Sequence, residues 1–365
     1  MEAALRFDGI SDGNFRLLHR QAGQAGRIFK INALPVITGD VIEAARSTRV
    51  AGNECQRAPE KQRRLILKVT FLCSVIFCKA EKLGYNNGML ETSAHPRRYH
   101  FLSGLPRSGS TLLAAILRQN PRFSAGMSSP VAGLVQALLH EMSGQNEFSV
   151  FINNAQRQRI LRGVVEHYYA GTSAAVAFDT NRSWCGKLPV LAALFPDSKV
   201  IACVRDLPWI FDSIERLVRR NAFEPSSLFH YQSGGTVYTR VNGLAGPEGL
   251  VGYAYDALKE AYYGELAAGR LMLVQYESLV SHPERTLQAL YAFLEEPPYT
   301  HDLGHVVFEA EAYDRKAGTP GLHEIRPRVE AVERTTILPP ELFQKFRGDA
   351  FWKDPSRIRK DIPVL

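Results

Sequence analysis

The sequence predicts an α/β protein built on a parallel sheet with helices on both faces. From Tyr99 onward, short apolar runs alternate with segments of helical periodicity, and strand–helix–strand order at this spacing is typical of parallel sheets. Residues 199–204 are apolar almost without a break, which indicates a strand covered on both faces.

Each element is expected from its local pattern. We predict strands at residues 99–102, 176–178, 199–204 and 271–274, and helices at residues 111–119, 208–220 and 283–294. In the first helix, apolar residues recur on one face, and Asn120-Pro121 is expected to end it. The late segment from Tyr313 to Thr336 is rich in Arg, Lys and Gly and predicts little regular structure.

The domain organisation follows from a change of texture near Met89. We expect residues 1–98 to be an N-terminal extension that is poorly ordered or precedes the native start, and residues 99–365 to form the functional domain. The apolar run Val69 to Cys78 follows a basic flank. It is shorter than the roughly 18–20 residues that span a bilayer, so a membrane anchor is not expected.

Charge and cysteine content narrow the classes of function. Residues 1–98 hold 16 Lys and Arg against 9 Asp and Glu, which accounts for the whole net charge of +7; residues 99–365 hold 28 of each. Nucleic-acid binding by the main domain therefore loses its main support. The five cysteines are an odd number without metal-ligand spacing, which suits a reducing, cytoplasmic environment and predicts no metal site.

The most informative segment is the turn Gly104 to Thr111, between the first strand and its helix. It matches the phosphate-loop pattern G-x-x-x-x-G-K-[ST] except that Ser110 replaces the lysine. Backbone N–H groups of such a loop and the following helix start bind an anion; an ordinary Gly/Ser-rich turn is the alternative. The expected contacts are Arg107, Ser108, Gly109, Ser110 and Thr111.

The substitution in the loop favours one donor chemistry. Phosphoryl transfer from ATP needs the missing lysine and a metal ion. The nucleotide 3′-phosphoadenosine-5′-phosphosulfate (PAPS) has no γ-phosphate, and backbone amides, Arg107 and the two hydroxyls of Ser110 and Thr111 could bind its 5′-phosphosulfate without Mg²⁺. The loop therefore fits a sulfonate donor better than ATP.

A second anion site is expected at Arg205 and Ser213. Arg205 follows the apolar strand and so emerges at its carboxyl end, where open α/β sheets bind ligands. A guanidinium can engage two phosphate oxygens and a hydroxyl a third, which suits the 3′-phosphate of PAPS. The alternative is that Arg205 pairs with Asp206 or Asp212 and that Ser213 is an ordinary helix residue.

Three blocks resemble motifs of the PAPS-dependent sulfotransferase family, in its bacterial tyrosylprotein-sulfotransferase-like branch. They are residues 105–112, residues 194–206 with Ser213, and residues 274–279 with Pro283 and the helix ending at Leu294. The resemblance spans about residues 99–350. It implies a P-loop, nucleotide-kinase-like parallel sheet, PAPS as co-substrate without a metal, and Tyr276 near the adenine, although Tyr276 could merely cap its strand.

The resemblance also suggests catalytic roles. It implies that Arg107 stabilises the developing charge and that a second cation is either Arg182 or Lys187, between which the sequence does not choose. The family's glutamate base is missing from residues 125–130, so the base is unassigned; Asp179 is a weak substitute, with a turn or cap role as its alternative. Lys316 and Arg334 are candidate donors from a late loop that closes over the nucleotide.

The acceptor is an unidentified hydroxyl or amine, and the missing glutamate argues against tyrosyl peptides. The sequence does not assign the oligomeric state, and a homodimer is one candidate. Two other classes remain open: an ATP-dependent P-loop phosphotransferase, and a non-catalytic nucleotide-binding module.

Overall fold

The computed structural model describes residues 5–8, 16–19, 97–223 and 235–365. The chain divides into two units, Met1–Glu91 and Thr92–Leu365. In the first, β1 (Leu5–Asp8) pairs antiparallel with β2 (Arg16–His19). The apolar run at 69–78 and Met89 lie outside the described residues. Within the described part of the chain, no helix combines the length and apolarity needed to cross a bilayer.

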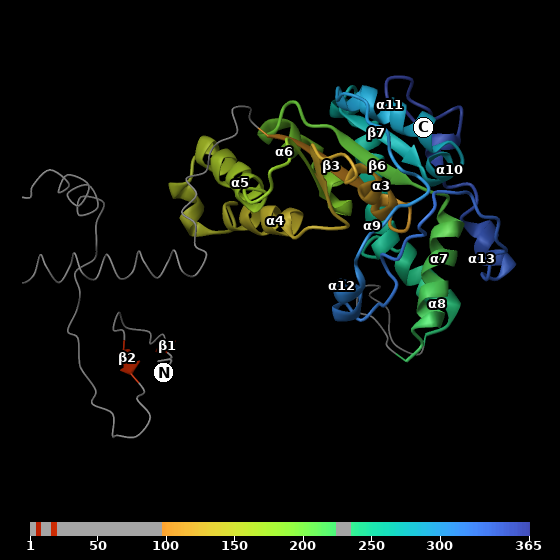
Figure 1. The fold of residues 1–365 in the computed structure, drawn as a ribbon, viewed down its shortest axis with the longest axis horizontal. Helices are drawn as coiled ribbons and strands as arrows, with labels where there is room; N and C mark the ends of the chain where they lie inside the picture. Colours follow the sequence, from red (N-terminus) through yellow and green to blue (C-terminus); the bar gives the residue numbers. More distant parts are fainter. Residues whose placement is uncertain (1–4, 9–15, 20–96, 224–234) are drawn as a thin grey trace, which may run out of the picture. The chain divides into compact units, whose positions relative to one another are not determined.

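The second unit is built on a five-stranded sheet (Figure 1). Its strands are β3 (Arg98–Gly104), β4 (Phe123–Ala125), β5 (Val176–Thr180), β6 (Val200–Val204) and β7 (Leu271–Gln275). All pairings are parallel, in the order β4-β5-β3-β6-β7. The expected fold class is therefore confirmed, as are the four expected strands, while the three-residue edge strand β4 was not predicted.

Helices α3 to α9 lie between the strands in the chain, and α10 to α13 follow the last strand. They are α3 (Ser110–Leu117), α4 (Val131–Glu141), α5 (Asn154–Tyr168), α6 (Leu188–Leu194), α7 (Leu207–Arg220), α8 (Val237–Ala245), α9 (Leu250–Tyr263), α10 (Tyr276–Ser281), α11 (Pro283–Leu294), α12 (Glu311–Lys316) and α13 (Pro340–Lys345). The 3₁₀ turns are η3 (Glu147–Phe151), η4 (Arg182–Lys187), η6 (Glu265–Ala267) and η7 (Phe351–Lys353). The three predicted helices are α3, α7 and α11; the late segment is irregular, as expected, except for α12 at its start.

Side chains alternate between two cores, one on each face of the sheet. In β6, Val200, Ala202 and Val204 join one cluster, while Ile201 and Cys203 join the other. The first cluster includes residues of α4 to α9, and the second residues of α3, α10 and α11. Because every residue of β6 is buried, its unbroken apolar run is explained by packing on both faces.

The order of the strands places a ligand site. The chain builds β4 and β5 on one side of β3 and then crosses to build β6 and β7 on the other. The loops leaving the carboxyl ends of such strands diverge and open a crevice, where doubly wound folds bind their ligands. The loop after β3 and Arg205 after β6 both start at this edge.

Candidate active site

The carboxyl end of β3 approaches β6 so closely that glycine is required. Gly104 has φ of 97°, and a Cβ there would lie 2.2 Å from the carbonyl oxygen of Cys203. Gly109, the N-cap residue of α3, has φ of 90°, and no side chain caps the helix start. The first N–H groups of α3 thus lack a capping side chain, as an anion-binding helix start requires.

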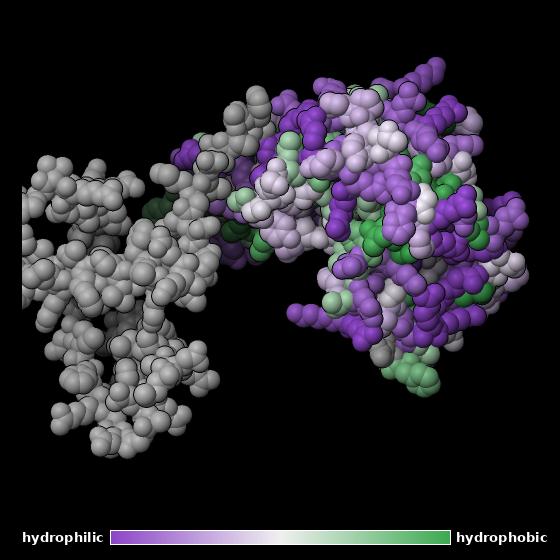
Figure 2. All heavy atoms as spheres, in the orientation of Figure 1, coloured by the Kyte–Doolittle hydropathy of each residue, from purple (hydrophilic) through white to green (hydrophobic). Residues whose placement is uncertain are grey.

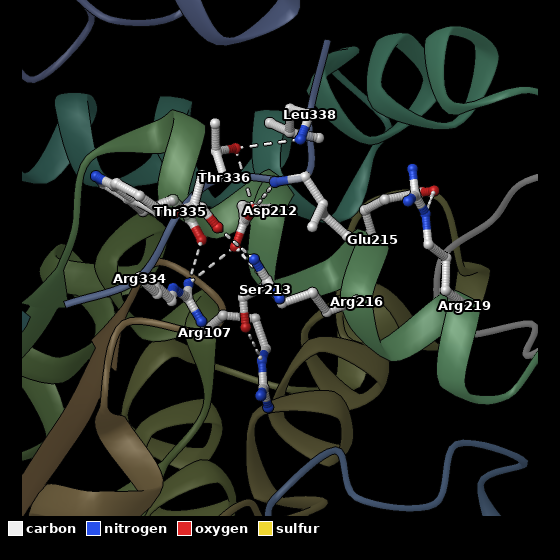
Figure 3. Close-up of polar contacts among 12 residues, drawn as sticks. Arg107, Asp212, Ser213, Glu215, Arg216, Arg219, Arg334, Thr335, Thr336 and Leu338 are labelled. Atoms are coloured by element: carbon white, nitrogen blue, oxygen red, sulfur yellow. Dashed lines mark hydrogen bonds and ion pairs between the residues drawn. The ribbon is translucent and has the colours of Figure 1, made fainter. Parts of the chain in front are cut away.

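Arg107 links this loop to α7. Its backbone is left-handed, with φ of 58°, which costs a non-glycine residue about 1–2 kcal/mol. Its Nε–H donates to Oγ of Ser213 at 3.1 Å (Figure 3). Its Nη1 donates to the carbonyl of Leu322. Burial, and next the positive charge of Arg205, lowers the pKa of Arg107 to about 10, so the side chain remains a cation at neutral pH.

Arg205 lies over an aromatic ring beside the loop. Its guanidinium carbon is 4.2 Å from the ring centroid of Tyr276, and its Nε is 3.8 Å from Oε1 of Glu277. The Nε–H is buried without a hydrogen-bond partner among the described residues. Burial, followed by the charge of Arg334, lowers the pKa of Arg205. A buried cation with an unpaired donor is a costly arrangement that an anionic ligand would relieve.

Asp212 ties the late segment to α7. Its carboxylate accepts from Nε of Arg216 at 2.9 Å, from the backbone N–H of Ile337 at 2.7 Å and from the hydroxyl of Thr336 at 3.1 Å, and it pairs with Nη2 of Arg334 at 3.3 Å (Figure 3). Arg334 is thereby held beside Trp209 and the cavity, with its own Nε buried and unpartnered in the described structure.

These groups line one cavity of about 470 Å³. Its walls include residues 104–107 and 109–112, Arg205, Ser213, Tyr276 and residues 321–326 of the late segment. Its lining residues include eight arginines and two glutamates; Asp212 and Glu277, outside the lining, pair with three of these arginines, and positive charge still predominates. The cavity therefore selects a ligand with several negative charges, and its volume is within the roughly 300–1,000 Å³ typical of small-molecule sites.

Of the other expected site residues, some line the cavity and others lie outside it. Arg182, at the start of η4, lines the cavity, whereas Lys187 at its end does not and donates to Oε1 of Gln136. Lys316, in the last turn of α12, is also absent from the lining. Ser108 is buried behind the loop, where its hydroxyl lies 3.4 Å from the carbonyl of Pro106.

Asp179 lies in the core rather than in the cavity. Its Oδ2 accepts from Ser129 at 2.6 Å and Tyr169 at 2.7 Å, and its Oδ1 accepts from the indole N–H of Trp184 at 2.6 Å. Burial raises its pKa, while these three donors lower it less. Both oxygens are engaged and the residue does not line the cavity, so the geometry gives Asp179 a structural role, as an acceptor for three side chains rather than as a turn or cap residue.

Sequence reasoning missed several cavity residues. His323, Asn181 and Arg216 line the site without any motif that marked them beforehand. His323 lies within the Gly-rich late segment, where its pairing with a carboxylate nine residues earlier could not be inferred from periodicity.

The surface of the described part of the second unit is predominantly hydrophilic in the view of Figure 2, with only small hydrophobic areas.

The family profile of sulfotransferases matches residues 100–301, more than half of the chain, and this chain belongs to the sulfotransferase family. The matched region contains the loop at 104–111, Arg205 with Ser213, and the block around Tyr276. The enzyme therefore transfers a sulfonate group to an acceptor.

Two curated proteins and one solved structure are similar to parts of this chain. Protein-tyrosine sulfotransferase 1 of Danio rerio is 26% identical over 277 residues, covering 73% of this chain and 69% of its own length. Protein-tyrosine sulfotransferase 1 of Mus musculus is 27% identical over 276 residues, covering 73% and 66%. A solved sulfotransferase domain from the curacin biosynthetic pathway aligns with a TM-score of 0.42 and 16% identity, over 74% of this chain and 95% of that domain.

Proposed function

We propose that PAPS is the sulfonate donor and that it spans the cavity, with its 5′-phosphosulfate on the loop at 104–111 and its 3′-phosphate at Arg205 and Ser213. The observation that carries the proposal is the hydrogen bond from Arg107 to Ser213, because it brings the two anion sites to one wall of one cavity. The hydroxyl hydrogen of Ser213 remains free to donate, since Ser213 only accepts in this bond.

The unpaired donors support a fit to this nucleotide. Two buried guanidinium N–H groups, Nε of Arg205 and Nε of Arg334, lack partners among the described residues. A phosphate accepts several hydrogen bonds at once and would engage such groups. The ring of Tyr276, already against Arg205, offers a surface beside which a purine could pack.

In the reaction, PAPS supplies an activated sulfonate, and the chain's own residues bind and stabilise it. Arg107 of the loop and Arg182 of η4 are cations that line the cavity, and the start of α3 adds N–H donors. Charge that develops on the sulfonate and on the departing phosphate oxygen would be stabilised by these preorganised groups. Burial lowers the pKa of Arg182, which nonetheless remains an arginine cation.

A binding comparison tests this proposal. Thermal unfolding is followed with 3′,5′-adenosine bisphosphate, the product that PAPS would leave, and separately with ATP plus Mg²⁺. We expect the bisphosphate at saturating concentration to raise the Tm by mass action, and ATP with Mg²⁺ to raise it less. A larger shift with ATP, together with Mg²⁺-dependent ATP turnover, would instead assign a phosphotransferase.

A further inference from the structure

The cavity contains a histidine–carboxylate pair that the donor site does not use. His323 lines the cavity, and its Nδ1 lies 2.6 Å from Oδ1 of Asp314. The backbone N–H of His323 also donates to Oδ2 of the same carboxylate, at 2.8 Å. Asp314, from α12, is buried and thus holds both the ring and the backbone of His323.

Asp314 determines which nitrogen of the His323 ring carries the hydrogen. A carboxylate can only accept hydrogen bonds, so the short contact requires that Nδ1 of His323 carries the hydrogen. In the neutral ring, Nε2 then carries the lone pair. No described residue makes a hydrogen bond to Nε2, so this nitrogen is available to a molecule in the cavity.

The loop that carries His323 is tied to the donor site. Arg107 donates to the carbonyl of Leu322, the residue immediately before the histidine. On the other side, Glu324 pairs with Arg220 of α7 at 2.7 Å, and Gly321 makes the turn with φ of 82°. These contacts bring His323 next to the cation that touches both anion sites.

Other carboxylates of the cavity are less suited to take a proton. Glu324 is exposed, and its Oε2 pairs with Nη1 of Arg220. Glu330 is also exposed, and its Oε2 lies 3.7 Å from Nε of Arg328. Asp179 does not line the cavity and is enclosed by its three donors. Among the described residues that line the cavity, His323 is therefore the base whose lone pair is both oriented and free.

We propose, on the basis of the sulfonate transfer proposed above, that His323 is the general base and that Asp314 positions it. Nε2 of His323 takes the proton of the acceptor O–H or N–H while the acceptor atom forms its bond to sulfur. The bond between sulfur and the bridging phosphate oxygen breaks, and adenosine bisphosphate departs with the electron pair. The imidazolium returns its proton to solvent.

The electrostatic surroundings keep this base neutral. The groups that face His323 are Asp314, the cations Arg107 and Arg182, and the ring of Tyr313, whose centroid is 5.5 Å away. Burial is the largest influence and lowers the pKa of His323; Asp314 raises it, and the two arginines lower it. The ring is therefore largely neutral at neutral pH, with its lone pair available.

The test uses a series of phenols of decreasing acidity, with p-nitrophenol at the acidic end and water as the last acceptor. For the full chain with PAPS, we expect His323→Gln to lower kcat by about 10²–10⁴-fold for weakly acidic phenols, the usual contribution of a general base. For p-nitrophenol, which ionises without help near neutral pH, the loss is expected to be far smaller. A purely structural role would lower both rates equally.

Asp314→Asn is the second variant and His305→Gln the matched control. The asparagine keeps the shape but no longer enforces the tautomer, so we expect the acidic limb of the pH profile to move and kcat to fall less than in His323→Gln. His305 is exposed and absent from the cavity, and its variant is expected to match the wild type. Circular dichroism and thermal unfolding establish that each variant is folded.

The outcomes separate this inference from the donor assignment. If the wild type does not bind adenosine bisphosphate, both fail. If it binds the bisphosphate and transfers sulfonate, but His323→Gln retains wild-type kcat across the series, only the base assignment is overturned. A wild type that binds the bisphosphate but transfers to no acceptor, water included, overturns it as well.

Discussion

Arg107 and Ser213 lie 106 positions apart in the chain, yet Nε of the arginine is 3.1 Å from the serine hydroxyl. One follows β3 and the other lies in α7, which follows the neighbouring strand β6. The contact makes Arg107 part of both anion sites, so its removal is expected to affect more than the loop that carries it.

Replacing Arg107 should affect turnover far more than donor affinity. We expect Arg107→Asn to lower kcat by about 10²–10³-fold, the cost of losing one preorganised donor to developing charge. Asparagine is preferred to alanine because it tolerates the left-handed backbone at this position. Steady-state kinetics with PAPS, alongside calorimetry with adenosine bisphosphate, measures the two effects; a loss of affinity alone would refute a role in the transition state.

Replacing Arg205 should instead weaken binding. We expect Arg205→Ala to reduce the affinity for 3′,5′-adenosine bisphosphate by about 1.5–3 kcal/mol, the scale of a charge-assisted hydrogen bond. Titration calorimetry measures this directly. Arg347→Ala removes an exposed arginine outside the cavity and serves as the control. Equal affinities for the two variants would contradict the assignment of Arg205 to the 3′-phosphate.

The positions of the two expected anion-binding segments could be predicted from the sequence because they depend on local sequence pattern. The apolar run of β6 and the glycines of the loop place Arg205 and residues 104–111 at strand ends, and parallel topology then brings those ends together. It could not distinguish Arg182 from Lys187, which lie at opposite ends of the same turn, η4. Their difference arises from where that turn packs, which no periodicity encodes.

The pair formed by Asp314 and His323 was still harder to predict from the sequence. Asp314 and His323 belong to an irregular segment whose conformation is set by distant contacts, such as Arg107 to Leu322 and Arg220 to Glu324. Asp179 is the opposite case. Its position near the end of a strand suggested a site residue. Only tertiary packing reveals that Trp184, Tyr169 and Ser129 occupy its oxygens.

Asp179 should therefore matter for stability and not for chemistry. We expect Asp179→Ala to lower the free energy of unfolding by about 3 kcal/mol or more, because it leaves buried donors such as the Trp184 indole N–H unsatisfied. The kcat per folded molecule should remain close to wild type. Urea unfolding and active-site-normalised kinetics provide the comparison, and a folded variant without turnover would restore Asp179 as a candidate base.

Gly104 should tolerate no side chain. Its positive φ would strain alanine by about 1–2 kcal/mol, and overpacking against β6 would add roughly 1–3 kcal/mol, because the new Cβ would meet the Cys203 carbonyl. Gly133→Ala is the control, since its Cβ would have no neighbour within 4 Å and alanine favours the helix. Urea unfolding should show Gly104→Ala destabilised and Gly133→Ala unchanged or stabilised; similar effects would contradict the close approach.

His100 should make the protein sensitive to acid. Its ring is buried, and Nδ1 accepts the backbone N–H of Lys199 at 3.1 Å, a bond that protonation of Nδ1 would break. Burial, together with the charges of Arg98 and Lys199, lowers its pKa from 6.5 to about 3. Between these values the unfolded chain binds more protons than the folded one, so stability is present above pH 6.5 and is lost as the pH falls, by about 1.4 kcal/mol per unit for this group.

Urea unfolding of the wild type and of His100→Gln at several pH values measures the difference in slope, with His305→Gln as the exposed control. Parallel pH profiles for His100→Gln and the wild type would show that this buried imidazole is not the acid-sensitive group.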